Sequence, residues 1–215
     1  MSPPALEPAA FIARLRALLR ELPAGARHVV ALAGAPASGK STLAAEAEDQ
    51  LNRQAPGACA VLPMDGFHYD DEVLVPRGWR PRKGAPHTFD VGGLFATLNR
   101  LRRNDEPMIA VPRFDRSLEI ARAGARLIER SVRLILVEGN YLLLKDPPWA
   151  ALAPLFDTTA LIRAEEDALV RRLTGRWQAY GLDEAAVREK LEDNDLPNGR
   201  LVYAGSREPD IVVLT

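Results

Sequence analysis

Residues 34 to 41 read G-A-P-A-S-G-K-S, and this short segment constrains the fold more than any other part of the chain. It follows the run H-V-V-A-L-A-G (28 to 34), whose small and branched apolar residues are typical of a buried parallel strand. An alanine-rich segment with helical character begins at Lys40 and runs to about Arg53. The pattern G-x-x-x-x-G-K-S between a strand and a helix predicts a phosphate-binding loop.

Such a loop binds phosphate through its backbone and one lysine. Its glycines let several N–H groups point at one anion, and the helix that follows adds the positive end of its dipole. Lys40 is expected to reach the β- and γ-phosphates of a nucleotide, and the Ser41 hydroxyl to complete a Mg²⁺ shell. An ordinary glycine turn with a solvated lysine is the alternative. The candidate nucleotide-binding residues of the loop are Gly34, Ala35, Pro36, Ala37, Ser38, Gly39, Lys40, Ser41 and Thr42.

Strands and helices alternate along the rest of the chain. We expect helices at 8–22, 91–103 and 165–180, and strands at 58–65, 108–112, 132–139, 158–164 and 210–214. Residues 66–90 lack periodicity and are interpreted as a long functional loop, while 115–130 is either a helix broken at Gly124 or a loop and short strand. This alternation predicts a parallel α/β sheet that is covered on both faces and binds its ligand at the carboxyl ends of the strands.

Composition excludes several classes of protein. The chain has 215 residues, of which 47% are hydrophobic, so we expect one domain spanning 1–215. The net charge of −1 does not favour nucleic-acid binding. A single cysteine, Cys59, excludes a disulfide framework, and His28, His68 and His87 lack metal-ligand spacing. Without a signal pattern or a long apolar run, we expect a cytoplasmic protein that does not contact membranes.

Two carboxylates follow buried strands at the same predicted edge of the sheet. Asp65 ends A-V-L-P-M-D and is placed to accept a proton from an attacking hydroxyl, although a turn-forming Asp before Gly66 is the alternative. Glu138 ends R-L-I-L-V-E, where a second acidic group would bind the metal or its water, although a solvated carboxylate would look the same. With the phosphate loop, these residues predict phosphoryl transfer chemistry.

Three longer segments carry a resemblance to a known family. They are M-D-G-F-H-Y-D-D-E-V-L-V-P-R-G-W-R-P-R-K-G-A-P-H-T-F-D (64–90), V-P-R-F-D-R (111–116) and V-E-G-N-Y-L-L-L (137–144). The chain resembles the phosphoribulokinase, uridine kinase and bacterial pantothenate kinase family of P-loop kinases, and in particular its small bacterial members labelled nucleoside kinase-like or fructose transport system kinase. The resemblance runs from about residue 28 to the C-terminus.

The resemblance implies a fold and a set of site residues. The fold is a three-layer P-loop α/β domain with a five-stranded parallel sheet in the order 2-3-1-4-5. Asp65 matches the family's catalytic base, and Glu138 matches its Mg²⁺-associated acid. The implied substrate-binding residues are His68, Asp90, Arg113 and Phe114, with Phe114 standing where the family has tyrosine.

A helical lid is expected within about 165–195. Leu169, Leu173, Trp177 and Tyr180 form an apolar stripe, and Arg172 and Arg176 share another face of the same helix. The resemblance implies that this helix closes over ATP, with Arg172 in a catalytic role and Arg176 bound to ATP; a solvated helix face is the alternative. The segment 194–210 resembles the part of the family that surrounds the adenine.

These features together predict an ATP-dependent kinase that uses Mg²⁺ and phosphorylates a hydroxyl of a small molecule. Nucleosides, sugars and pantothenate-like alcohols all remain open as acceptors. A P-loop ATPase or a nucleotide-binding regulatory module is the alternative, whereas a GTPase is disfavoured because no Asn-Lys pair occurs. The expected partner is the small-molecule substrate, and a homodimer stays open.

Overall fold

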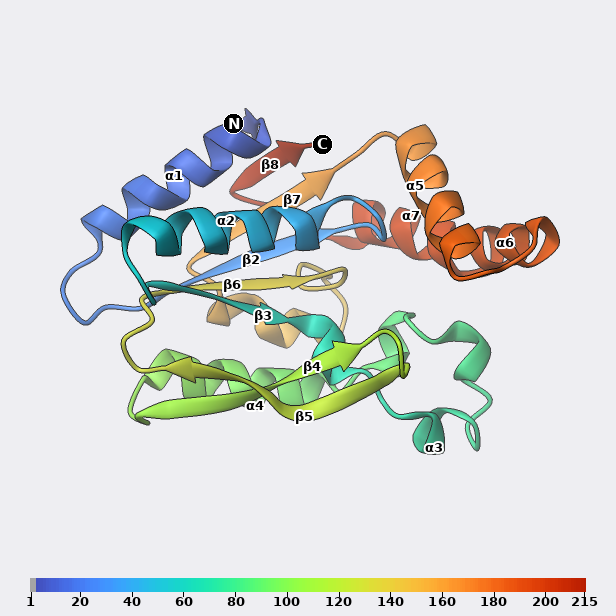
Figure 1. Cartoon of the computed structure of the whole chain (residues 1–215), viewed down its shortest axis with the longest axis horizontal. Helices are drawn as coiled ribbons and strands as arrows, with labels where there is room; N and C mark the ends of the chain where they lie inside the picture. Colours follow the sequence, from blue (N-terminus) through green and yellow to red (C-terminus); the bar gives the residue numbers. More distant parts are fainter. Residues whose placement is uncertain (1–2) are drawn as a thin grey trace.

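The computed structural model describes residues 3–215 and contains a six-stranded parallel sheet with helices on both faces (Figure 1). The strands lie in the order β1-β8-β7-β2-β6-β3. Their bounds are Ala5–Leu6 (β1), His28–Gly34 (β2), Cys59–Pro63 (β3), Leu134–Gly139 (β6), Thr158–Arg163 (β7) and Ile211–Leu214 (β8). Every neighbouring pair is parallel, so the carboxyl ends of all six strands face the same edge.

The expected number of five strands is wrong. The sixth strand is β1, which pairs with β8 through Val212 and Val213. Only two residues make this strand, which is too short for a hydrophobic pattern to reveal it. When β1 is set aside, the remaining strands follow the expected order 2-3-1-4-5.

Two hydrophobic cores cover the two faces of the sheet. Helices α1 (Pro8–Glu21) and α2 (Lys40–Gln54) pack on one face, and α4 (Val91–Arg103) with the 3₁₀ helix Trp149–Leu155 packs on the other. All six residues of β6 are buried, as expected for a central parallel strand. This burial explains why the strand appears in the sequence as a continuous apolar run rather than an alternating one.

A separate antiparallel hairpin lies beside the sheet, below β3 in Figure 1. It consists of β4 (Met108–Asp115) and β5 (Ile120–Glu129), so the helix considered for 115–130 is wrong. The Asp115 carboxylate accepts hydrogen bonds from the backbone N–H and the hydroxyl of Ser117, which stabilises a turn at this point. The register shifts between Val111 and Arg113, at a proline that has no N–H to donate.

Four helical segments project beyond the carboxyl ends of the strands, on the right of Figure 1. They are α5 (Glu166–Ala179), α6 (Glu184–Lys190), a π-helical turn (Leu191–Asp195) and α7 (Leu196–Gly205). Leu169, Leu173 and Val187 belong to a small apolar cluster of their own. The expected loop 66–90 contains α3 (Asp71–Leu74) and short 3₁₀ turns. Between residues 3 and 215, none of the helices combines the length and the apolar character needed to cross a membrane.

Candidate active site

The phosphate loop connects β2 to α2 in a conformation that only certain residues tolerate. Gly39, which precedes the first residue of α2, has a φ of 90°, in the left-handed region that favours glycine. Lys40 is 8% exposed, and its Nζ donates to the carbonyl of Ala35 at 3.4 Å, so the ammonium lies over the loop itself. The buried Oγ of Ser38 has no hydrogen-bond partner among residues 3–215. The geometry therefore presents a helix N-terminus and a cation to one small volume.

Ser41 and Glu138 form a candidate metal site beside this loop. Ser41 Oγ donates a hydrogen bond to Glu138 Oε2 at 2.9 Å. Burial raises the pKa of Glu138, and the Asp65 charge acts in the same direction, so a nearby cation would stabilise the ionised form. One carboxylate and one hydroxyl suit Mg²⁺, which prefers oxygen ligands and keeps several waters.

Asp65 follows β3 in the 3₁₀ helix Met64–Phe67, on the strand next to Glu138. The close approach of these strands depends on Gly139, because a Cβ at this position would overlap the side chain of Met64. Burial acts to raise the pKa of Asp65, but the charges of His68, Arg116 and Lys40 hold it below its ordinary value. Burial in turn lowers the pKa of His68, so the charge of the Arg116 guanidinium is the one that persists at neutral pH.

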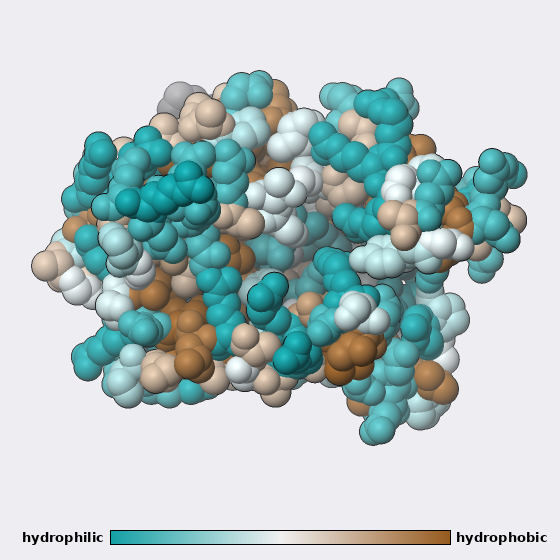
Figure 2. Space-filling view, viewed as in Figure 1, coloured by the Kyte–Doolittle hydropathy of each residue, from teal (hydrophilic) through white to brown (hydrophobic). Residues whose placement is uncertain are grey.

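A pocket joins the phosphate loop to the segments around it. Figure 2 shows this face of the molecule hollowed between the body of the sheet and the helices α5 and α6. The loop contributes Lys40 and Ser41, the 64–90 segment contributes Asp65 and His68, and the helical segments close the opposite side. The main lining residues from these other segments are Arg80, Lys83, Phe89, Phe114, Arg116, Asn140, Arg176, Trp177, Asn194, Asp195 and Asn198.

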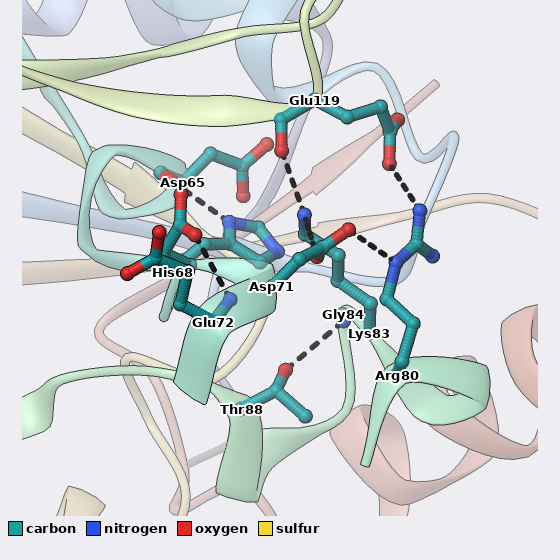
Figure 3. Close-up of polar contacts among 10 residues, drawn as sticks. Asp65, His68, Asp71, Glu72, Arg80, Lys83, Gly84, Thr88 and Glu119 are labelled. Carbon is teal, nitrogen blue, oxygen red and sulfur yellow. Dashed lines mark hydrogen bonds and ion pairs between the residues drawn. The ribbon is translucent and has the colours of Figure 1, made fainter. Parts of the chain in front are cut away.

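His68 is held rigidly on one wall of this pocket. Its ring lies 4.0 Å from the ring centre of Phe89 and 4.7 Å from that of Phe114. Nδ1 lies 2.8 Å from the carbonyl oxygen of Asp65, as Figure 3 shows. Because a carbonyl only accepts, Nδ1 carries the proton, and Nε2 of the neutral ring is left as a hydrogen-bond acceptor.

An ionic network between the 66–90 loop and the turn of the β4–β5 hairpin closes the same wall (Figure 3). Asp71 accepts from Arg80 Nε at 2.6 Å and from Lys83 Nζ at 2.7 Å. Lys83 also donates to the carbonyl of Glu119 at 2.7 Å, and its side chain is 7% exposed. These contacts fix the hairpin turn against the pocket, which gives the wall its shape.

Two arginines of α5 lie at different places relative to the loop. Arg172 Nη1 donates to the carbonyl of Ala37 at 3.2 Å and lies 3.4 Å from Thr215 Oγ1. It lines a second cleft, over the start of α2, together with Gly39 and Thr42. Arg176 lines both this cleft and the pocket that contains Asp65.

Comparison with known proteins agrees with this geometry, although no family profile matches the chain. "Putative uridine kinase C227.14" from Schizosaccharomyces pombe is 33% identical over 195 residues, covering 87% of this chain and 83% of the relative. The chain belongs to the uridine kinase, pantothenate kinase and phosphoribulokinase family of P-loop kinases.

Solved structures of P-loop kinases superpose over nearly the whole chain. The "putative fructose transport system kinase" from Silicibacter sp. TM1040 is 38% identical and has a TM-score of 0.86, covering 96% of this chain and 98% of that one. YFH7 from Saccharomyces cerevisiae, a "putative P-loop containing kinase", has a TM-score of 0.84 at 20% identity, with coverage of 98% and 99%. The second likeness concerns the P-loop kinase fold alone.

Within this P-loop kinase, Asp90 lines neither of the two pockets that contain Asp65, whereas the other expected substrate residues each line one of them. The Asp90 carboxylate accepts from the backbone N–H of Gly93 at 2.8 Å and so caps α4, with its side chain facing solvent. Arg113 is exposed and lines a cleft along the hairpin that also contains Asp65, Ser41 and Glu138. His68 and Phe114 do line the pocket.

The segment 194–210, expected to surround the adenine, lies beside the phosphate loop and α5 as well as in the Asp65 pocket. Its first residues line the Asp65 pocket rather than the cleft over α2 that contains Arg172. Its middle forms α7, and its end leads into β8.

Several pocket residues of this kinase were not singled out from sequence. Arg116 ends the segment V-P-R-F-D-R, and Asn140 follows Glu138 and Gly139 directly, so both belong to motifs that were recognised. Arg80 and Lys83 lie in the recognised segment 64–90, and Asn194 and Asp195 lie in 194–210, but their place in the pocket depends on how the 66–90 loop and the π-helical turn pack.

Proposed function

We propose that this P-loop kinase transfers the γ-phosphoryl group of ATP to a hydroxyl of a small molecule. The observation that carries the proposal is that Asp65 and Lys40 line the same pocket. Asp65 is on the acceptor wall, and its lowered pKa keeps it ionised at neutral pH, as a general base requires. Lys40 lies on the nucleotide side.

The cleft over the start of α2 would hold the nucleoside end of ATP. It adjoins the pocket that contains Asp65, since Lys40 and Ser41 line both of them. Arg172 would bind ATP near the loop, and Arg176 would reach the transferred group when α5 and α6 close as a lid. This exchanges the roles that the resemblance implied for the two arginines.

Ser41 and Glu138 would hold Mg²⁺, directly or through its water. The bound ion would neutralise charge that develops on the β- and γ-phosphates. The chain's own contribution is positioning: the loop holds the phosphates, Asp65 accepts the proton of the attacking hydroxyl, and the pocket excludes water from the transfer path. Relatives named for uridine and fructose support an alcohol acceptor.

A coupled assay of ADP release tests this function and separates it from its alternatives. Purified protein is given Mg²⁺–ATP alone, and then Mg²⁺–ATP with uridine, D-fructose or pantothenate. We expect ADP release to depend on one of these alcohols. Equal release with and without every acceptor would identify an ATPase, and tight ATP binding without release would identify a regulatory module.

A further inference from the structure

Two buried asparagines with no role in the transfer step described above are bonded to each other in the helical segments beyond the strands. Asn194 lies in the π-helical turn Leu191–Asp195 and is 7% exposed, and Asn198 lies about one turn later, in α7, and is 3% exposed. Asn198 Nδ2 donates a hydrogen bond to Asn194 Oδ1 at 3.1 Å. Burying an amide is costly unless its other donors and acceptors are bonded too. The other partners of these two amides therefore show what the pair connects.

The other bonds of the pair lead to two consecutive residues of the 66–90 loop. Asn194 Nδ2 donates to the carbonyl of Lys83 at 3.2 Å, and Arg82 Nη2 donates to Asn198 Oδ1 at 3.3 Å. The same guanidinium donates from Nη1 to the carbonyl of Asp193 at 2.7 Å. We call Arg82, Lys83, Asn194 and Asn198 the asparagine bridge. It joins parts of the chain that are 111 to 116 positions apart.

On its other side, α7 lies directly against the phosphate loop. A Cβ at Gly199, the residue after Asn198, would be 3.3 Å from the Cβ of Ala35 and 3.8 Å from the Cδ of Pro36. The first of these distances is shorter than the best separation of two carbon atoms, so the helix leaves little free space over the loop. Closely packed groups transmit a displacement rather than absorb it. We therefore expect a change at Ala35 or Pro36 to reach Asn198.

The bridge holds a part of the 66–90 loop that depends on side chains for its position. Around the bridge this loop forms short 3₁₀ turns. The Gly84 N–H donates to Thr88 Oγ1 at 3.0 Å (Figure 3), and the hydroxyl of Tyr141 donates to the Gly84 carbonyl at 2.6 Å. Segments with few backbone ladder bonds open at a low free-energy cost. The position of this pocket wall therefore depends on contacts such as the bridge.

We propose that the asparagine bridge couples the phosphate loop to the 66–90 loop, so that a bound nucleotide orders the wall of the acceptor pocket. Arg82 and Asn194 are positioning residues in this scheme, because they act on the loop and not on the transferred group. Coupling between two sites is reciprocal, so a bound acceptor should raise the affinity for the nucleotide by the same factor. The inference rests on the proposed kinase function and deepens it by assigning the contacts through which the two substrate sites affect each other.

Hydrogen exchange with a non-hydrolysable nucleotide tests the coupling without an acceptor. Amide exchange over 66–90 is measured in the free protein and at saturating Mg²⁺–AMP-PNP, with calorimetry to ensure equal occupancy in every variant. In the wild type we expect the nucleotide to slow exchange about fivefold or more, at the lower end of typical coupling between sites. Arg82→Ala removes two contacts at an exposed side chain, so this slowing should be lost.

Arg77→Ala is the matched control, because Arg77 is an exposed arginine of the same loop whose hydrogen bond, to the carbonyl of Val73, stays within the loop. It should keep the wild-type response to the nucleotide. Asn194→Ala breaks the bridge from the helical side and should reproduce Arg82→Ala; if it lowers the melting temperature, the comparison of the two arginine variants decides. The absence of slowing in the wild type, or equal slowing in Arg82→Ala and Arg77→Ala, would overturn the bridge.

Kinetics give a second readout with an acceptor identified by the ADP-release assay. Arg82→Ala should raise the acceptor KM about fivefold or more and change kcat little, because the bridge positions the pocket wall and takes no part in the transfer. A fall in kcat with an unchanged KM would overturn this role. If no acceptor stimulates ADP release, the kinase function fails, while the exchange measurement still tests the bridge because it requires the nucleotide alone.

Discussion

Arg116, in the turn of the β4–β5 hairpin, donates a hydrogen bond from Nη2 to Oδ2 of Asp65 across 2.7 Å. The guanidinium is more than half exposed, while the Asp65 side chain is 23% exposed. The contact uses one carboxylate oxygen, so Oδ1 stays available to an incoming hydroxyl. Arg116 thereby orients the proposed base without blocking it.

We expect Arg116→Ala to shift the pH dependence of the reaction. Arg116 is one of the charges that hold the pKa of Asp65 below its ordinary value, so its removal should raise that pKa. The ionised base would then be lost at a higher pH, and the acidic limb of kcat/KM should move upward in pH. Arg122→Ala is the control, because Arg122 pairs with Asp115 on the same hairpin. Identical profiles in the two variants would contradict this role.

Asp65→Asn should abolish most acceptor phosphorylation and spare nucleotide binding. The amide retains the size of the side chain but does not take the acceptor proton, and losing a general base costs about 10²–10⁴-fold in rate. ATP affinity and melting temperature should stay close to those of the wild type, because the phosphate loop makes the nucleotide contacts. Asp193→Asn serves as the exposed control. If turnover survives in Asp65→Asn, Glu138 becomes the next carboxylate to test.

Lys40→Ala should reduce turnover by at least about 10²-fold, at the lower range for the loss of a group that stabilises transition-state charge. Lys40 is buried over the loop, and no other lysine lines the start of α2 in the described residues. The backbone cradle remains, so calorimetry should still detect ADP binding. Lys145→Ala, which changes an exposed lysine, should match the wild type. Wild-type turnover in Lys40→Ala would remove the nucleotide-site assignment.

The two arginines of α5 should separate binding from catalysis. Arg176→Ala is expected to lower kcat with a small change in ADP affinity, because Arg176 lines both the nucleotide cleft and the acceptor pocket. Arg172→Ala should mainly weaken ADP affinity, because its guanidinium bonds to the phosphate loop. Arg171→Ala, an exposed neighbour, is the control. If both variants alter only thermal stability, the arginines belong to a solvated helix face.

Cys59 should report on unfolding. The thiol is buried at the start of β3, and burial raises its pKa to about 12. Since the thiolate is the reactive form, a thiol reagent should label the native protein slowly at pH 8. Labelling in increasing urea should follow the loss of secondary structure seen by circular dichroism. Rapid labelling of the native state would show that β3 opens locally.

The sequence by itself determined the features that depend on neighbouring residues. The phosphate loop was predictable because its features lie close together in the sequence. Gly39 adopts the left-handed backbone conformation of the turn, and α2 begins at the next residue, Lys40. The expected strand at 132–139 was confirmed, since a continuous apolar run is typical of a buried parallel strand. Asp65 and Glu138 were found as candidates for the same reason: both end such strands. The order of the five longer strands, which the family resemblance implied, is found when β1 is set aside.

Only the tertiary structure decided which polar side chains share a pocket. Arg116 is 51 positions from Asp65. The chain contains many other arginines, and nothing in the sequence distinguishes Arg116 from them as the partner of Asp65. Asp90 matched a family position, yet the structure uses it to cap α4. Asp195 lies in the pocket because a π-helical turn packs against Lys83. Long-range contacts of this kind depend on the free energy of the whole fold, and local sequence patterns do not record them.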